Sequence, residues 1–240
     1  MSETITSQSV LNNIIDFSLI EDEFVNFLRI NLVDRRDRAE YAEESFTSTG
    51  SNTFELTGDL DSKSRHKIMA ISSVDVDGTS QTFIKDYACS FRNGDDLLGK
   101  LYFWNAPVSG AVVTVKYYYK YSMVFVEKPR INLSTNSYPR VSFQLVSSDP
   151  TDVAIGGKVG KFDITLRLTI VDLTKTQVQK IVQKIHYLFT RESNKHGFHT
   201  VDYVRNPKTT PMDDNGEDEN DVVYIQQVDL ECPNQYQFSK

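Results

Sequence analysis

The residues of this sequence that could carry chemistry are few, and their spacing matches no common catalytic or metal-binding pattern. The histidines at 66, 186, 196 and 199 are not accompanied by Cys-x-x-Cys or His-Glu-x-x-His spacing, which disfavours a zinc site. The chain has no Gly-x-Ser-x-Gly elbow and no glycine-rich phosphate loop. The sequence therefore predicts that the protein is not an enzyme and holds no metal and no cofactor.

One segment, from residue 213 to residue 221, is dense in carboxylates. Calcium prefers such oxygen ligands, but Gly216 lies at the wrong offset for an EF-hand loop. We expect a charged loop that does not pack, that is mobile or faces a lumen, and that binds no metal. Its acidic residues are Asp213, Asp214, Glu217, Asp218, Glu219 and Asp221.

A second charged cluster contains Arg35, Arg36 and Arg38, with aspartates at 34 and 37 between them. Arginines in this density could contact phosphate. The alternative, which we favour, is an exposed helix end whose charges pair locally, because the aspartates cancel the field that a phosphate needs.

Aromatic side chains gather at Tyr117–Tyr121, with Trp104 nearby in the sequence. Such a cluster could stack on bases or sugars. The interpretation we favour is that alternate tyrosines face a core and the others cover a sheet edge.

Composition narrows the class of protein further. Apolar residues make up 39% of the 240 residues, so the chain can bury a core. A net charge of −7 argues against electrostatic binding to nucleic acid, and two cysteines are too few for a disulfide scaffold. The N-terminus lacks the basic start of a signal peptide, and no apolar run is long enough to cross a membrane.

The spacing of apolar residues along the sequence predicts the helices and strands that position these residues. Apolar residues at three- and four-residue steps predict a helix over 9–33. Period-two segments over 46–121, separated by turns at Asp77-Gly78, Asn93-Gly94 and Ser109-Gly110, predict a small antiparallel sandwich or barrel.

The pattern over the remainder predicts two strands, a helix and two further strands. A long strand over 161–171 alternates, with Asp163, Thr165, Arg167 and Thr169 on its wet face. A helix over 177–191 follows a capping box at Thr174, and the last strands are expected at 199–204 and 222–230.

These elements predict an α+β fold: a mixed or antiparallel sheet covered by two helices, with an inserted all-β module, sandwich- or barrel-like. The N-terminal helix needs a partner for its apolar face, so we expect it beside the helix over 177–191 on the same sheet. Residues 1–44 and 123–240 then form one discontinuous domain, and residues 45–122 form the inserted module.

Two stretches carry a family resemblance: Phe27-Leu28-Arg29-Ile30-Asn31-Leu32-Val33-Asp34, and later Ser137-Tyr138-Pro139-Arg140-Val141-Ser142-Phe143. With the long strand and the helix that follow, the chain resembles the neck and tail-terminator (tail completion) proteins of tailed bacteriophages and archaeal tailed viruses. The segment over 74–118 is similar to small β-modules of virion proteins.

The resemblance implies a virion structural protein, made in the host cytoplasm, that forms a ring, with a hexamer as the expected copy number. Its implied partners are further copies of itself, the tail tube protein and the head connector or adaptor proteins; DNA passes through without specific binding, and no membrane is involved. The arginine cluster and the wet strand face are the candidate ring interfaces. Two alternatives remain: a head–tail adaptor or head-closure protein, and, in another class, a β-module adhesion or carbohydrate-binding accessory protein that binds through its aromatic cluster.

Overall fold

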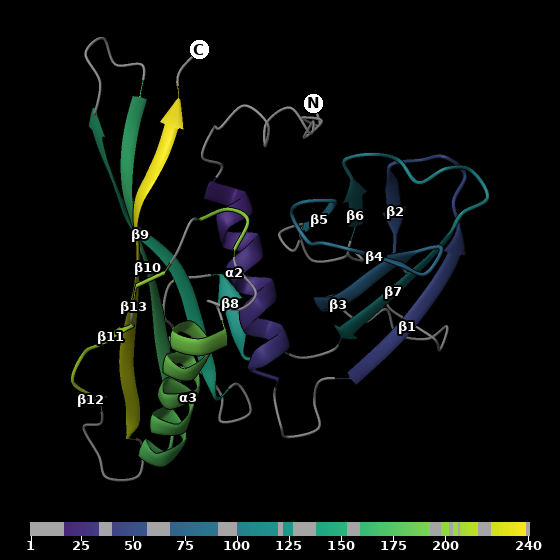
Figure 1. Ribbon diagram of the computed structural model, residues 1–240. Helices are drawn as coiled ribbons and strands as arrows, with labels where there is room; N and C mark the ends of the chain where they lie inside the picture. The colour runs from purple at the N-terminus through teal and green to yellow at the C-terminus, as the bar shows by residue number, and fades with distance from the viewer. Residues whose placement is uncertain are drawn as a thin grey trace. The chain divides into compact units, whose positions relative to one another are not determined.

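The computed structural model (Figure 1) describes residues 17–33, 40–56, 68–90, 100–119, 122–126, 138–152, 159–192, 198–201, 204–205, 207–215 and 222–238. Most of these residues lie in β-strands, which form three sheets, and two α-helices accompany them. The protein therefore belongs to the α+β class. The helices cover little of the sheets, and there is more than one sheet.

The chain divides into two compact units, with divisions between Glu21 and Asp22 and between Ser122 and Met123. The first division falls inside helix α2 (Phe17–Asn31), so that Phe17–Glu21 group with unit 2 and the rest of the helix groups with unit 1.

Unit 1 contains two antiparallel sheets. The first has the order β1-β7-β3-β4 and the second the order β2-β6-β5. One cluster of buried side chains draws on both sheets, including Val113, Val115 and Tyr117 from the first and Leu101 and Phe103 from the second. The two sheets therefore pack face to face around one core. The strands are β1 (Glu40–Thr47), β2 (Thr53–Glu55), β3 (Ile68–Val76), β4 (Thr79–Gln81), β5 (Tyr87–Ser90), β6 (Lys100–Phe103) and β7 (Val112–Tyr119).

The predicted turn at Asp77-Gly78 is confirmed as the two-residue connection of a hairpin between β3 and β4. Both residues have positive φ, 48° and 76°, which suits a type I′ turn and explains the glycine. The backbone N–H of Asp77 donates to the carbonyl of Val112, and the Asp77 carboxylate accepts from the Val112 N–H, at 2.8 Å each. Gly110 also has positive φ, and the predicted turn at 93–94 lies outside the described residues.

Helix α2 completes the open edge of β3 with side chains instead of a strand. Asn26 donates from Nδ2 to the carbonyl of Ile71 at 3.1 Å, and its Oδ1 accepts from the Ile71 N–H at 2.8 Å. Arg29 Nη1 donates to the carbonyl of Met69 at 2.9 Å. Met69 and Ile71 are two residues apart, so their backbone groups point to the same edge of β3. Strand β4 pairs with a later part of this edge, and the helix side chains take the place of a strand at Met69 and Ile71.

Unit 2 is built on a six-stranded sheet of order β11-β13-β10-β9-β8, with β12 also pairing β13. Among the described strand pairs of this sheet, only β8 with β9 is parallel. Helix α3 (Lys175–Tyr187) contacts β10 and β13, and a π-helical turn (Leu188–Glu192) follows it. The strands are β8 (Val124–Val126), β9 (Arg140–Asp152), β10 (Val159–Asp172), β11 (Lys208–Thr209), β12 (Asp213–Asn215) and β13 (Val223–Phe238).

The predicted long strand over 161–171 and the helix over 177–191 are confirmed, as β10 and as α3 with its π-helical turn. The capping box at Thr174 is wrong: Thr174 makes no side-chain cap within the described structure, and the Asp172 carboxylate instead accepts from the Thr174 N–H and hydroxyl. The strand expected over 199–204 is also wrong for the residues described there, which contain no strand. The edge of β13 is paired by β11 and β12 instead.

Two β-bulges flank β10, one in each of its neighbouring strands. In β9, Val146 is an extra residue between the pairs Leu145–Leu166 and Ser147–Thr165. In β13, Pro233 and Asn234 stand opposite the single residue Asp163. Bulges increase local twist and bend a sheet, and proline is tolerated at such points because ladder pairing is already interrupted.

The expected packing of α2 beside α3, like the division into residues 1–44 with 123–240 and 45–122, stays a prediction. What the structure describes for the second half of α2 is its contact with β3.

Candidate interface on the polar face of the six-stranded sheet

Strict alternation along β10 separates an apolar face from a polar one. Ile164, Leu166, Leu168 and Ile170 are buried, and α3 contributes a buried stripe of four apolar residues. Thr209 of β11 pairs in register with Val228 and contacts His186 of α3 through its hydroxyl. Because registered partners share a face, α3 covers the apolar face of this sheet, and the polar face lies opposite.

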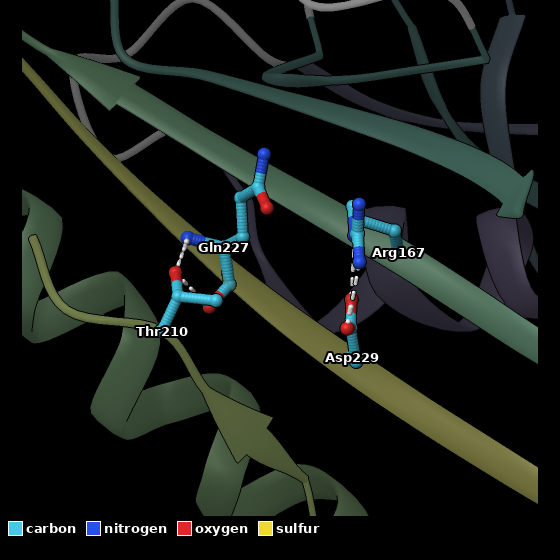
Figure 2. A network of polar contacts seen from close by, with 4 residues as sticks. All are labelled: Arg167, Thr210, Gln227 and Asp229. Atoms are coloured by element: carbon cyan, nitrogen blue, oxygen red, sulfur yellow. Dashed lines mark hydrogen bonds and ion pairs between the residues drawn. The ribbon is translucent and has the colours of Figure 1, made fainter. Parts of the chain in front are cut away.

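The centre of the polar face is an ion pair between Arg167 on β10 and Asp229 on β13 (Figure 2). These residues are registered partners, and the guanidinium donates from Nε to Oδ1 at 2.7 Å and from Nη2 to Oδ2 at 2.9 Å. The hydrogen bonds to Asp229 raise the pKa of Arg167. A two-point contact of this kind fixes the planar geometry of both side chains as well as their charge.

Next to this pair, Thr210 continues the hydrogen bonding of β11 along β13 (Figure 2). The Thr210 N–H donates to the carbonyl of Gln227 at 3.0 Å, and its hydroxyl accepts from the Gln227 N–H at 3.2 Å. Gln226 Nε2 donates to the Thr210 carbonyl at 3.0 Å. The short strand β11 is thereby held on β13 beyond its two ladder residues.

A second charged group lies on the same face, at the β11 edge. Glu231 accepts a hydrogen bond from Lys208, and Arg205 Nη1 lies 3.5 Å from its other oxygen. The Lys208 hydrogen bond, helped by Arg205, lowers the pKa of Glu231. Sequence analysis missed Glu231, Lys208 and Arg205, as well as Asp229, because only strand register brings them to this face.

The four residues predicted for the wet face differ in accessibility. Asp163 is exposed, and Thr165 and Arg167 are partly exposed. Thr169 is only 2% exposed, and its hydroxyl and that of its registered partner Ser142 are buried with no hydrogen-bond partner among the described residues. Thr169 therefore does not belong to the accessible part of the face, and the wet strand face ends at Arg167.

The other predicted interface, Arg35, Arg36 and Arg38, lies outside the described residues. So do Glu217, Asp218, Glu219 and Asp221 of the acidic segment. The expectation of a loop is wrong at the start of the segment, because Asp213 and Asp214 belong to strand β12 and pair with Ile225 and Tyr224 of β13. The Asp213 side chain is nevertheless exposed.

The aromatic cluster of unit 1 is largely committed to packing. Tyr117 is 1% exposed, and its hydroxyl donates to Glu44. Trp104 Nε1 donates to the carbonyl of Ile84 at 2.6 Å. Tyr118 is half-buried, and Tyr41 contacts it edge-on, with ring centroids 5.4 Å apart. Of these rings, Tyr41 is 52% exposed, and Tyr117, Tyr118 and Trp104 are buried or half-buried.

Within the described ranges, no three histidine, cysteine or carboxylate side chains come together in a way that could hold a metal ion. A search of the same residues for a helix long and apolar enough to cross a membrane found none. Comparison of the chain with models of known protein families, with curated proteins and with solved structures found no match.

Proposed function

We propose that this protein is a virion structural component of the neck and tail: a tail terminator whose copies form a ring, a hexamer, that joins the tail tube to the head connector. The observation that carries the proposal is the order of elements that follows the Tyr138-Pro139-Arg140 segment. That order, β9, amphipathic β10, α3 and β13, is the one that the family resemblance implies.

The finer architecture belongs to the same proposal. Residues 1–44 and 123–240 form one domain, whose sheet is covered by both helices, and residues 45–122 form an inserted β-module. In this function the inserted module is an elaboration on the ring-forming domain, and DNA passes through the ring without sequence-specific contacts.

A polar, charged sheet face supports this function physically. Subunits that are made separately and then assemble must expose an interface that does not aggregate, and charged pairs such as Arg167–Asp229 on a rigid sheet meet that need. A head-to-tail contact between identical copies closes into a ring when its rotation closes.

The test is the mass and shape of the purified protein. Mass photometry and negative-stain electron microscopy should show rings of uniform diameter, and infection without the gene should leave filled heads beside unjoined, overlong tails. Tails of normal length that fail to join heads would assign the protein to the head–tail adaptors instead. Normal virions without the gene would refute a function in the neck.

A further inference from the structure

Helix α3 exposes a surface that is basic and free of acid. Its three lysines, Lys175, Lys180 and Lys184, are all exposed, and the helix contains no aspartate or glutamate. The helix therefore carries a formal charge of +3 in a chain whose net charge is −7. The net charge does not describe this surface, because salt at physiological ionic strength limits the reach of an exposed charge to about 8 Å.

The lysines flank a neutral ridge of the helix. With about 3.6 residues per turn, Lys180 and Lys184 lie on one flank of the exposed surface and Lys175 lies on the other. The exposed residues between the two flanks are uncharged: Thr176, Gln179, Gln183 and Tyr187. From Lys175 to Lys184 the helix rises by about 13.5 Å. Duplex DNA carries one negative charge per about 1.7 Å of its axis, so a surface of this length can face several phosphates.

The lysines do not stabilise the helix that carries them. Lys180 and Lys184 are four residues apart, a spacing at which like charges repel, and Lys175 lies in the first turn, where the helix dipole disfavours a cation. Lys184 lies 5.5 Å from the ring centre of Tyr187, but none of the three lysines has an ion pair with a described residue. Asp172, two residues before the helix begins, is buried and accepts from Thr174. The charge of the lysines is therefore available to a ligand.

The side chains around the lysines favour a phosphate ligand over a protein or a membrane. The centre of a protein interface is depleted in lysine and is built on apolar anchors, whereas Tyr187 is the only aromatic or aliphatic side chain that α3 exposes. A helix that binds a membrane surface inserts its apolar face. The apolar stripe of α3 is buried, and the helix contacts β10 and β13. What remains exposed is lysine, amide and hydroxyl, which suits the backbone of a nucleic acid.

We propose that the exposed surface of α3 binds the phosphate backbone of duplex DNA through Lys175, Lys180 and Lys184, without reading the base sequence. Lysine acts on a phosphate as a flexible point charge, so the contact does not depend on the bases. The binding is a property of each copy and goes beyond the proposed function. In a neck ring, this helix is the surface that the passing DNA contacts.

The first experiment removes the three charges and leaves a good helix former in each place, in the variant Lys175→Gln/Lys180→Gln/Lys184→Gln. Fluorescence anisotropy measures binding to a labelled duplex of about 20 base pairs, between about 50 and 200 mM salt. Three phosphate contacts per copy predict a slope of log K against log salt of about −2.7, so that affinity of the wild-type protein falls about 40-fold over this range. The variant should lose this salt-dependent binding, with unchanged circular dichroism, and arginine at the three positions should restore it.

The control for net charge is Thr49→Asp/Ser80→Asp/Ser109→Asp. It alters exposed positions of unit 1 and brings the net charge from −7 to −10, as the lysine variant does. This control should bind the duplex as the wild-type protein does. Equal losses in the two variants would show that net charge alone governs binding and would overturn the proposal. Two duplexes of unrelated sequence should bind with equal affinity, and a strong preference for one of them would refute binding without sequence readout.

The second experiment locates the contact on the wild-type protein. An amine-acetylating reagent is added with and without the duplex, and mass spectrometry follows each lysine. The duplex should slow acetylation of the three α3 lysines and leave Lys85, an exposed lysine of unit 1, unchanged. Protection of other lysines only would overturn the proposal.

The remaining outcomes separate this surface from other partners and from the proposed function. Loss of oligomers in the lysine variant but not in the control, measured by mass photometry without DNA, would assign the lysines to a contact between copies and overturn the proposal. Binding to phosphatidylserine vesicles in place of the duplex would overturn it as well. A wild-type protein that binds the duplex through these lysines but forms no rings refutes the proposed function and supports this inference, and rings without duplex binding do the reverse.

Discussion

At the scale of single residues, the buried side chain of Asn26 joins helix α2 to strand β3. Its amide satisfies both the N–H and the carbonyl of Ile71, on the part of the β3 edge that lies beyond the residues paired by β4. A buried backbone group that loses its partner costs more than the hydrogen bond contributed, because the group has left water without compensation.

We therefore expect Asn26→Ala to lower the free energy of unfolding by about 1–3 kcal/mol for the unsatisfied groups of Ile71. The matched control is Asn31→Ala, in the same helix, where the amide donates only to the carbonyl of Phe27 at 2.8 Å within the last turn. Urea unfolding followed by circular dichroism measures both. Equal losses of unfolding free energy in the two variants would contradict the conclusion that Asn26 satisfies the backbone of Ile71.

Glu231 should make stability depend on pH in the acid range. The Lys208 hydrogen bond lowers its pKa in the folded state, so its contribution is fully present above the unfolded pKa of about 4.3 and is lost as the pH falls through the folded pKa. Glu231→Gln should flatten the fall in melting temperature between neutral and acid pH. Lys208→Gln should flatten it as well, since it removes the first cause of the shift. Two variants that keep the wild-type profile would refute the coupling.

At the scale of elements, the bulge in β9 means that the strand can lose Val146 and keep its register with β10. Ser147 already pairs with Thr165 and Leu145 with Leu166, so the chain without Val146 keeps both pairs and loses only the extra residue. Deletion of Ser142 is the contrasting case, because the slipped strand would place Gln144 at the position of Phe143, opposite Leu168 in the core.

We expect the Val146 deletion to fold with a modestly lowered melting temperature and the Ser142 deletion to be severely destabilised, since a buried amide without partners adds to the lost aromatic packing. Thermal unfolding by circular dichroism compares them. Comparable melting temperatures would show that the register of β9 is not fixed by its apolar residues.

The same scale shows what local sequence patterns predict and what they do not. The alternation of β10, the apolar stripe of α3 and the Asp77-Gly78 turn depend on residues near in sequence, and each was predicted. Strand β13 continues to Phe238, past its predicted end at residue 230, because its last residues pair with β10. The sequence did not predict this continuation, because Pro233 and the polar residues after it have little strand propensity. Arg167 and Asp229 are 62 residues apart, and a single sequence contains no information on the register that joins them. The alternation of the strand correctly predicts that the Thr169 side chain points to the same face as Arg167. Alternation does not predict that this side chain is buried.

At the scale of the whole molecule, the arginines at 35, 36 and 38 stay a predicted interface. We expect Arg35→Glu/Arg36→Glu/Arg38→Glu to leave the subunit folded and to block ring formation or head–tail joining, because reversed charges repel the surface that these arginines would orient. Lysine at all three positions is the control that keeps the charge. Rings of normal mass in the glutamate variant would remove this cluster from the interface.

The two cysteines give the protein a built-in probe of its own unfolding. Cys89 is 1% exposed in the core of unit 1 and Cys232 is fully buried in unit 2, and burial raises the pKa of each thiol to about 12. Both should resist a chromogenic disulfide reagent at pH 8 in the folded protein, because the reactive thiolate is scarce and covered. In a Cys232→Ala variant the labelling rate at increasing urea reports the opening of unit 1, and in Cys89→Ala it reports that of unit 2. Rapid labelling of either thiol without denaturant would contradict its burial, and two different urea midpoints would mean that the two halves of the chain open as separate cooperative transitions.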